Sequence, residues 1–248
     1  MKIFLAGTAS RRKIVEAHPP IYLLESFYYF QDWQKALVTK AEDFLLDSGA
    51  FTFMSSSKTH VVWENYIERY ADFINRNKVE KFFELDIDSV IGYDKVLEYR
   101  KRLERLTNKP VIPVWHISRG MDEYYKMCEQ YPYVALGGIV GEKRGGTKYQ
   151  KYYAAFPKLI QIAHQYGCKI HGLGFTSTSL YGKIRFDSVD STTWVVGGKY
   201  GNLAYFNGDG MRQYCPSLHG KKPKDIKQLD ERNYLEWLKF QKWAVTHL

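Results

Sequence analysis

The chain has 248 residues, of which 45% are hydrophobic and 16% aromatic, and its formal net charge is +9. This is enough apolar material to bury one substantial core. No apolar run approaches the roughly 18 residues that a membrane-spanning helix needs, so we expect no membrane contact. The N-terminal apolar run is too short for a secretory signal and suits a first strand better.

Charge and cysteine content indicate the class of partner and the cellular location of the protein. A basic excess favours a polyanionic partner, because neutralising phosphates releases counterions. A soluble protein that is merely basic is the alternative. Cys128, Cys168 and Cys215 lie far apart without CxxC spacing. This spacing disfavours a disulfide framework and favours a reducing, cytoplasmic location.

Short segments rich in β-forming residues alternate with segments of helical spacing. Helical spacing is clearest over 63–74 and 156–163. Eight strands in roughly 190 residues predict an α/β fold, a compact (β/α)8 barrel of the TIM type, with an open doubly wound sheet as the competitor. The eight predicted strands are 2–6, 21–25, 44–47, 81–86, 111–116, 133–137, 169–174 and 186–190.

The last part of the chain does not continue the alternation of strands and helices. A turn at 207–210 and a basic link at 220–224 precede a helical pattern from Asp230 to Leu248. We expect a single domain with a catalytic barrel over 1–205. The basic link and helix over 206–248 would form an extension that packs on the barrel or binds a partner.

Polar and glycine-rich clusters follow six of the predicted strands. Each one alone fits a turn or a helix cap. Six at equivalent places indicate an active site, because chemistry in such barrels collects at the carboxyl ends of strands. We expect Asp47 and Asp190 to be its two working carboxylates. The clusters are 47–51, 84–88, 115–118, 137–142, 171–174 and 187–193.

Carboxylates from different strands can divide the labour of glycosyl transfer. One suits attack at an anomeric carbon, where a nearby negative charge stabilises the oxocarbenium-like transition state. A second moves a proton on the departing or entering base. A third can accept hydrogen bonds from the N–H edge of a purine-like base. Paired glycines let a flat ring approach the backbone.

Several of these clusters resemble motifs of the tRNA-guanine transglycosylases (queuine tRNA-ribosyltransferases). The run 46–51 resembles their Asp-Ser-Gly-Gly-aromatic motif, and 85–87 resembles their base-recognising aspartate segment. The run 135–142 is similar to their glycine-pair loop, 171–174 to their Met-Gly-Val-Gly strand end, and 189–191 to their nucleophile motif. The motifs occur in the family's order and span most of the chain from Asp47 to about Gly201.

The resemblance implies a role for each matching residue. Asp190 is the expected nucleophile and Asp47 the general acid/base, with Asp187 as the rival nucleophile. Asp86 would read the base, and Phe51 and His171 would sandwich its ring. No metal or redox cofactor is implied. The expected substrate-binding residues are Asp86, Ser48, Phe51, His116, Gly137, Gly138, Ile139, His171 and Gly172.

The sequence also departs from the family pattern. The structural zinc subdomain is missing, since Cys215 and His219 alone cannot supply four ligands. His116 stands where the family has a base-binding glutamine, and Ala50 replaces the second glycine. In these respects the chain resembles short phage-type relatives that act on DNA.

We therefore expect a transglycosylase that replaces guanine in DNA by a 7-deazaguanine (preQ0-like), in a bacterial or phage-infected cytoplasm. The alternatives are a minimal tRNA-guanine transglycosylase, a catalytically silent nucleic-acid-binding barrel subunit, and a nucleoside or sugar hydrolase that uses the same two carboxylates with water as acceptor. The sequence leaves open whether the protein forms a homo-oligomer or works with a partner protein. Five basic residues just beyond strand ends are expected to contact phosphates: Arg119, Lys143, Arg144, Lys148 and Lys199.

Overall fold

The protein is a parallel α/β barrel in the computed structural model, which describes residues 1–49, 52, 61–137, 153–175, 177–195, 201–214 and 226–248. Seven parallel strands form one curled sheet in the order β3-β2-β1-β7-β6-β5-β4. The strands are β1 (Lys2–Ala6), β2 (Tyr22–Ser26), β3 (Asp43–Asp47), β4 (Val114–Trp115), β5 (Tyr133–Leu136), β6 (Lys169–Gly172) and β7 (Ser188–Ser191).

A short eighth segment joins the two outer strands of this sheet. Phe82 forms a parallel bridge with Leu46 of β3, and Phe83 forms one with Ile112, just before β4. Hydrogen bonds of 3.0 Å from Phe83 N to Leu46 O and 2.8 Å from Ile112 N to Phe82 O hold the segment on both sides. The predicted eight-stranded ring is therefore confirmed, and the open sheet is excluded because β3 and β4 are joined.

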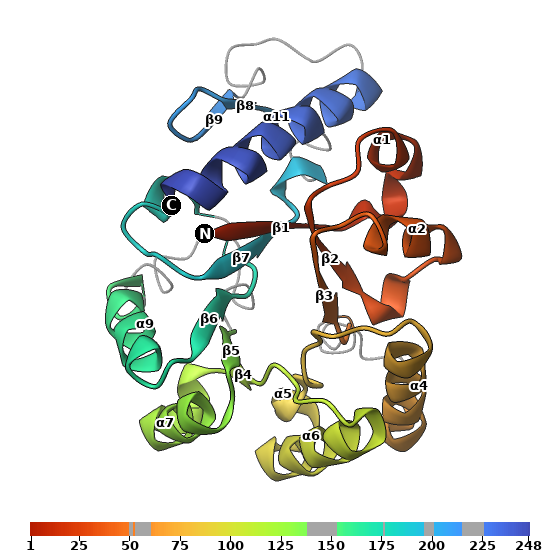
Figure 1. Cartoon of the computed structure of the whole chain (residues 1–248), viewed down its shortest axis with the longest axis vertical. Helices are drawn as coiled ribbons and strands as arrows, with labels where there is room; N and C mark the ends of the chain where they lie inside the picture. Colours follow the sequence, from red (N-terminus) through yellow and green to blue (C-terminus); the bar gives the residue numbers. More distant parts are fainter. Residues whose placement is uncertain (50–51, 53–60, 138–152, 176, 196–200, 215–225) are drawn as a thin grey trace.

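Helices follow the strands and surround the ring (Figure 1). In α4 the buried face carries Tyr66, Ile67, Tyr70 and Ile74, as the sequence spacing predicts. The helices are α1 (Arg12–Ala17), α2 (Lys35–Val38), α4 (Trp63–Arg76), α5 (Asp88–Ile91), α6 (Tyr93–Thr107), α7 (Gly120–Gln130), α9 (Phe156–Gln165) and α11 (Ile226–His247). Short 3-10 turns are η1 (Thr8–Ser10), η2 (Phe27–Tyr29), η3 (Asp32–Gln34), η4 (Ile117–Arg119) and η5 (Thr178–Leu180).

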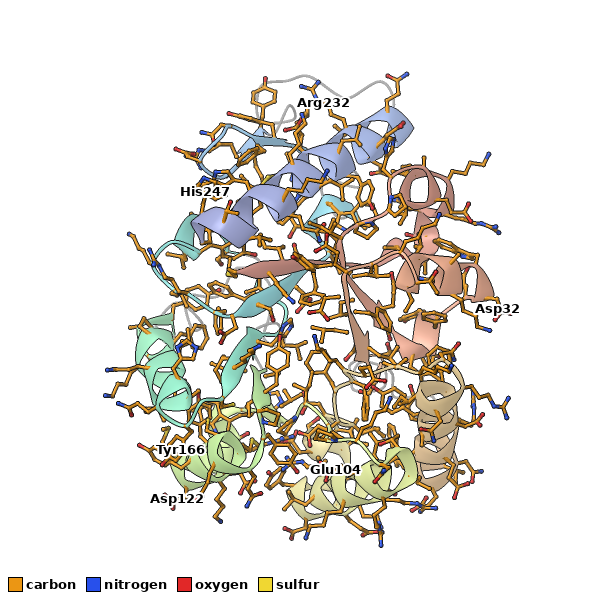
Figure 2. The ribbon with its side chains drawn as sticks, viewed as in Figure 1. Asp32, Glu104, Asp122, Tyr166, Arg232 and His247 are labelled. Atoms are coloured by element: carbon orange, nitrogen blue, oxygen red, sulfur yellow. The ribbon has the colours of Figure 1, made fainter. Side chains whose placement is uncertain are left out.

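Apolar side chains fill the inside of the barrel. Alternate residues of the strands point inward, and Phe4, Leu45 and Phe83 belong to this inner cluster with exposures of 1% or less. Side chains occupy the space that the strands enclose, whereas Asp122 and Arg232 lie at the periphery (Figure 2). Since the interior is packed, a site for a substrate has to lie at an end of the barrel.

The C-terminal helix α11 packs on β1 and on β8 (Leu203–Phe206), which pairs with β9 (Met211–Tyr214) in a separate hairpin. The Gln241 side chain donates to Ile3 O at 2.7 Å and to Tyr22 O at 2.8 Å. The predicted helix over 230–248 is thus present and begins at Ile226. The expected division at 205/206 falls inside β8. In the described parts of the chain, no helix is long and apolar enough to cross a bilayer.

Candidate active site

Asp47 is the last residue of β3 and shares a strand face with Leu45, which packs inside the barrel. Its Oδ2 accepts a hydrogen bond of 3.0 Å from the Gly49 N–H. Gly49 has a φ of 78°, and a Cβ there would lie 2.5 Å from Tyr28 Cβ. Only glycine therefore allows the tight turn that brings this N–H back to the carboxylate.

Asp47 lies close to two other carboxylates. Burial raises the pKa of Asp47 to about 6, the Gly49 N–H opposes this rise, and the charges of Asp190 and Asp86 add to it. The three acids therefore interact electrostatically at one end of the barrel. With this pKa, Asp47 holds and releases a proton near neutral pH, as a general acid/base must.

Asp190 is the third residue of β7 and is only 8% exposed. Its Oδ1 accepts the Gly174 N–H at 2.5 Å and lies 3.2 Å from His171 Nε2. The carboxylate is therefore held by the Gly174 N–H and by a ring nitrogen of His171, both from the end of β6.

Asp187 lies at the opposite end of the barrel from Asp190. Its carbonyl accepts the N–H of Lys2, the first residue of β1, at 3.0 Å. Its carboxylate bonds with His164 of α9 at 2.9 Å. Parallel strands begin at one end of a barrel and finish at the other, so only Asp190 shares an end with Asp47.

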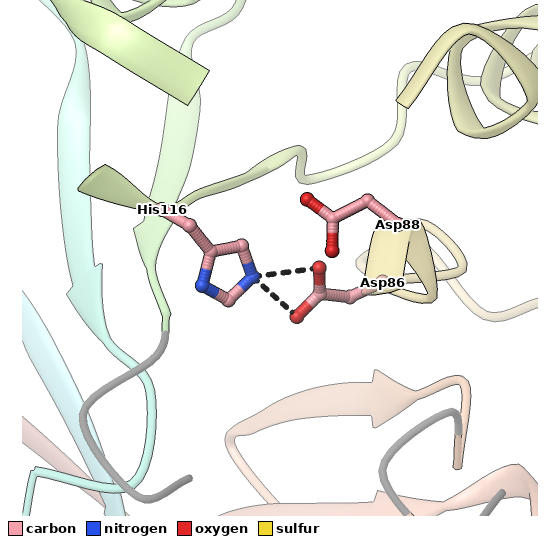
Figure 3. Close-up of side chains that lie close together, drawn as sticks. All are labelled: Asp86, Asp88 and His116. Carbon is pink, nitrogen blue, oxygen red and sulfur yellow. Dashed lines mark hydrogen bonds and ion pairs between the residues drawn. The ribbon is translucent and has the colours of Figure 1, made fainter. Parts of the chain in front are cut away.

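Asp86, Asp88 and His116 form a cluster at the same end (Figure 3). His116 Nε2 lies 2.7 Å from both carboxylate oxygens of Asp86. One ligand atom from each residue lies within 4.8 Å of the others, and this is the one such group among the described residues. Two carboxylates and an imidazole are ligands that divalent metals accept.

A buried arginine already supplies positive charge to this cluster. Arg119 donates to Glu84 at 2.7 Å, to Asp86 at 3.0 Å and to Asp88 at 3.0 Å, and its side chain is 1% exposed. Its guanidinium lies over the Tyr93 ring at 4.5 Å. The prediction that Arg119 contacts phosphate is therefore wrong, because its donors are spent on internal carboxylates. The same cation also competes with any metal there.

Glu84 is the fully buried ion-pair partner of Arg119. Burial alone would raise the pKa of Glu84, but Arg100 and Arg119 hold it below its usual value. Arg100 Nε donates to Glu84 at 2.6 Å, and the backbone N–H of Val114 donates to it at 2.9 Å. With three hydrogen bonds and two arginines around it, this buried charge fixes the base of the Asp86 cluster.

Two of the three glycines expected at the site, Gly137 and Gly172, are among the described residues and have different surroundings. At Gly137, a Cβ would lie 2.5 Å from Val114 Cγ1 and 2.7 Å from His116 Cε1. Glycine is therefore required for the His116 ring to lie against β5. At Gly172, a Cβ would lie 2.9 Å from the Phe186 ring. Gly172 serves core packing and is buried away from the surface.

His171 and Ser48 are both buried. His171 has no exposed surface, and its ring lies among the inner aromatic side chains, 6.1 Å from Phe4. The prediction that His171 stacks on a bound ring is therefore wrong, since it lies beneath Asp190. Ser48 is 1% exposed, and its carbonyl accepts the Tyr66 hydroxyl at 2.5 Å. It shapes the loop after Asp47.

Seven expected site residues lie outside the described residues. The same holds for the two residues weighed as remnants of a zinc site, Cys215 and His219. The seven are Phe51, Gly138, Ile139, Lys143, Arg144, Lys148 and Lys199.

Two exposed tyrosines that follow β2, the strand paired with β3, were missed by the sequence reasoning. Tyr28 and Tyr29 follow β2 directly in η2 and are 44% and 55% exposed. Their rings lie 4.8 Å apart at 87°, an edge-to-face pair. An aromatic pair directly after a predicted strand was the available signal, since exposed aromatic rings offer stacking surfaces for bases.

Glu25, near the end of β2, was also missed. It is 3% exposed, and the Thr8 hydroxyl donates to it while Gln34 Nε2 donates to Thr8 at 2.9 Å. Burial raises the pKa of Glu25 to about 7, against the opposing hydrogen bonds. Glu25 pairs in register with Leu46, one residue before Asp47, so it lies on the opposite strand face from Asp47.

Comparison with known proteins leaves the family of this chain open. The sequence matches no protein-family model and no curated protein. Among solved structures, the chain is similar to a GH113 β-1,4-mannanase. The TM-score is 0.41 and the identity 13%, over 72% of this chain and 73% of that one. So distant a likeness carries no argument about reaction or substrate, and the fold assignment rests on the strand pairing.

Proposed function

We propose that this protein is a transglycosylase that exchanges guanine in DNA for a 7-deazaguanine through a covalent aspartyl–sugar intermediate. The proposal rests on one observation above all. Asp47 and Asp190 lie at the same end of the barrel, near enough for the charge of Asp190 to raise the pKa of Asp47. A nucleophilic carboxylate beside a proton-carrying one is the pair that glycosyl transfer needs.

In the first half-reaction, a carboxylate oxygen of Asp190 attacks C1′ of the sugar. The C1′–N9 bond breaks and its electron pair leaves with guanine, while protonated Asp47 gives its proton to the departing base. The pKa of about 6 keeps part of Asp47 protonated near neutral pH. The nucleic acid stays bonded to Asp190 as an ester.

In the second half-reaction, the bond changes run in reverse with a different base. The anionic Asp47 accepts the N9 proton of the incoming 7-deazaguanine, whose N9 attacks C1′, and Asp190 leaves as a carboxylate. One proton has moved from the incoming base to the departing guanine, so neither aspartate is consumed.

The Asp86 cluster supports the choice of a purine-like base. Asp86 is held by Arg119 at 3.0 Å and by His116 at 2.7 Å, so its direction is fixed before a ligand arrives. A fixed carboxylate accepts the ring N–H groups of a guanine-like edge, whereas bases without those donors leave it unpaired. The net charge of +9 suits a polyanionic substrate.

Exchange of radiolabelled guanine into duplex DNA, single-stranded DNA and tRNA tests the proposal. We expect incorporation into DNA, faster where the guanine is unpaired, because extruding a base from a duplex costs a few kcal/mol. A covalent complex that survives denaturation should form with the wild type and be lost in Asp190→Asn. The matched control is Asp187→Asn at the opposite barrel end, which should keep exchange.

Three outcomes would overturn all or part of the proposal. Incorporation into tRNA alone would replace DNA as the polymer. Full exchange by Asp190→Asn would remove Asp190 from its role, and absence of exchange into any polymer would refute the transglycosylase itself.

A further inference from the structure

A chain of hydrogen-bonded side chains runs through the inside of the barrel to Asp190. The Tyr133 hydroxyl lies within hydrogen-bonding distance of Ser188 Oγ, which lies 2.5 Å from His171 Nδ1. His171 Nε2 in turn lies 3.2 Å from Asp190 Oδ1. Tyr133 and Ser188 are the first residues of β5 and β7, so the chain crosses from the strand starts to the candidate active site.

The direction of these hydrogen bonds follows from the carboxylate at the end. An ionised carboxylate only accepts hydrogen bonds, so His171 Nε2 must carry a proton. In a neutral imidazole Nδ1 is then an acceptor, and the Ser188 hydroxyl donates to it. Burial raises the pKa of Tyr133 above its ordinary value, so its hydroxyl keeps its proton and donates to Ser188.

The surroundings of His171 favour the neutral ring. His171 is fully buried, and the rings of Phe4, Phe83 and Tyr133 lie 6.1, 5.3 and 6.3 Å from it. An imidazolium there would be desolvated, which is costly. It would also neutralise the negative charge of Asp190, whereas a neutral N–H donor stabilises the carboxylate and leaves it anionic.

Both donors to Asp190 bind the same oxygen. The Gly174 N–H and His171 Nε2 both reach Oδ1, and no described residue donates a hydrogen bond to Oδ2. One oxygen is therefore anchored and the other is left for reaction.

We propose that Tyr133, Ser188 and His171 form a positioning relay that anchors Oδ1 of Asp190 and presents Oδ2, still anionic, to C1′ of the sugar. This rests on the proposed role of Asp190 as the nucleophile. His171 is a positioning residue, since it touches Asp190 and not the substrate. The relay fixes the tautomer of His171, and His171 fixes the rotamer of the reacting group.

Nitrogen NMR of the wild-type imidazole rings, with His171 assigned by substitution, tests the relay without reference to activity. We expect the proton of the neutral His171 ring to lie on Nε2, which faces Asp190. Ser188→Ala should weaken this preference. A proton on Nδ1 in the neutral ring would overturn the relay even if base exchange occurs.

Kinetics supply the second readout. His171→Leu keeps the bulk but removes the donor, and should lower kcat roughly 10- to 100-fold, as loss of an orienting partner does, with KM for DNA unchanged. His171→Gln retains a terminal N–H and should recover part of the loss. The matched control is His164→Leu, which breaks the exposed pair with Asp187 and should leave kcat unchanged.

These outcomes separate the relay from the reaction. If the wild type exchanges bases and both His171 variants keep full kcat, the relay is wrong and the transglycosylase stands. If the wild type exchanges no base, the proposed function fails, and the tautomer of His171 still decides the direction of the relay. Should His171→Leu fail to fold, Ser188→Ala and the wild-type spectrum carry the test.

Discussion

Replacing Asp47 by asparagine should stabilise the protein while abolishing base exchange. The folded protein raises the pKa of Asp47 from 3.8 to about 6, chiefly by burial. Between those values the folded chain keeps a proton that the unfolded chain releases. Stability therefore falls as pH rises through this window and stays lower above it. Asparagine removes this cost and still accepts the Gly49 N–H through its carbonyl oxygen.

The size of the effect follows from the shift. A rise of about 2 pKa units corresponds to about 3 kcal/mol, and because Asp47 is partly exposed this is an upper limit. For a domain of this length, 3 kcal/mol is a rise of roughly 6–12 °C in Tm. The gain should appear at high pH and vanish at low pH, where Asp47 is protonated in both states.

Urea unfolding of the wild type and Asp47→Asn at about pH 8 and about pH 4 measures this difference. Asp94→Asn, an exposed aspartate in the first turn of α6, is the control and should bring no stabilisation at either pH. Equal stability of Asp47→Asn and the wild type at both pH values would refute the reasoning, as would a gain that is independent of pH. Exchange activity retained by Asp47→Asn would remove it as the proton carrier.

Three further substitutions test the site. Arg119→Met should cost about 3–5 kcal/mol in urea unfolding, because it leaves the buried Glu84 with Arg100 alone and removes the arginine from Asp86 and Asp88; an unchanged midpoint would contradict this. Gly137→Ala puts a Cβ within 2.7 Å of His116 Cε1 and should raise KM for the base at least about tenfold while circular dichroism stays native; a wild-type KM would remove His116 from base binding. Tyr28→Leu should weaken DNA binding by about 1–3 kcal/mol in fluorescence anisotropy if its ring stacks on a base, and unchanged affinity would exclude that contact.

The order of strands could be predicted from sequence because each strand is a local pattern. Lys2–Ala6 is recovered with identical bounds. The predicted strand 81–86 is reduced to two bridged residues, Phe82 and Phe83. Propensity indicates an extended segment there, and the Glu84 N–H still bonds to Ile112 O at 3.1 Å, but the chain then turns, with Ile87 N bonded to Leu85 O at 3.1 Å.

The partners of the site residues could not be predicted in the same way. Arg119 follows a strand end and carries a charge, so it has the sequence features of a phosphate ligand. Its carboxylate partners lie about 30 residues earlier and meet it only in the fold. His171 likewise lies beside glycines that suggest an open site, and its position inside the ring depends on which strand face it occupies. A pattern of period 2 leaves that choice open when both faces are buried.

The attachment of α11 to β1 has a consequence for how the protein folds. Gln241 bonds the backbone of both β1 and β2, and Met1 N donates to Ala244 O at 3.2 Å. These contacts join residues more than 200 positions apart. The Trp194 Nε1–H likewise donates to Ala6 O at 2.9 Å, across 188 positions. Such long-range pairing slows folding and leaves β1 without its cover until residues 226–247 have been synthesised. During translation the first strand is the exposed edge of an incomplete ring, and chaperone dependence or aggregation of nascent chains should be concentrated there.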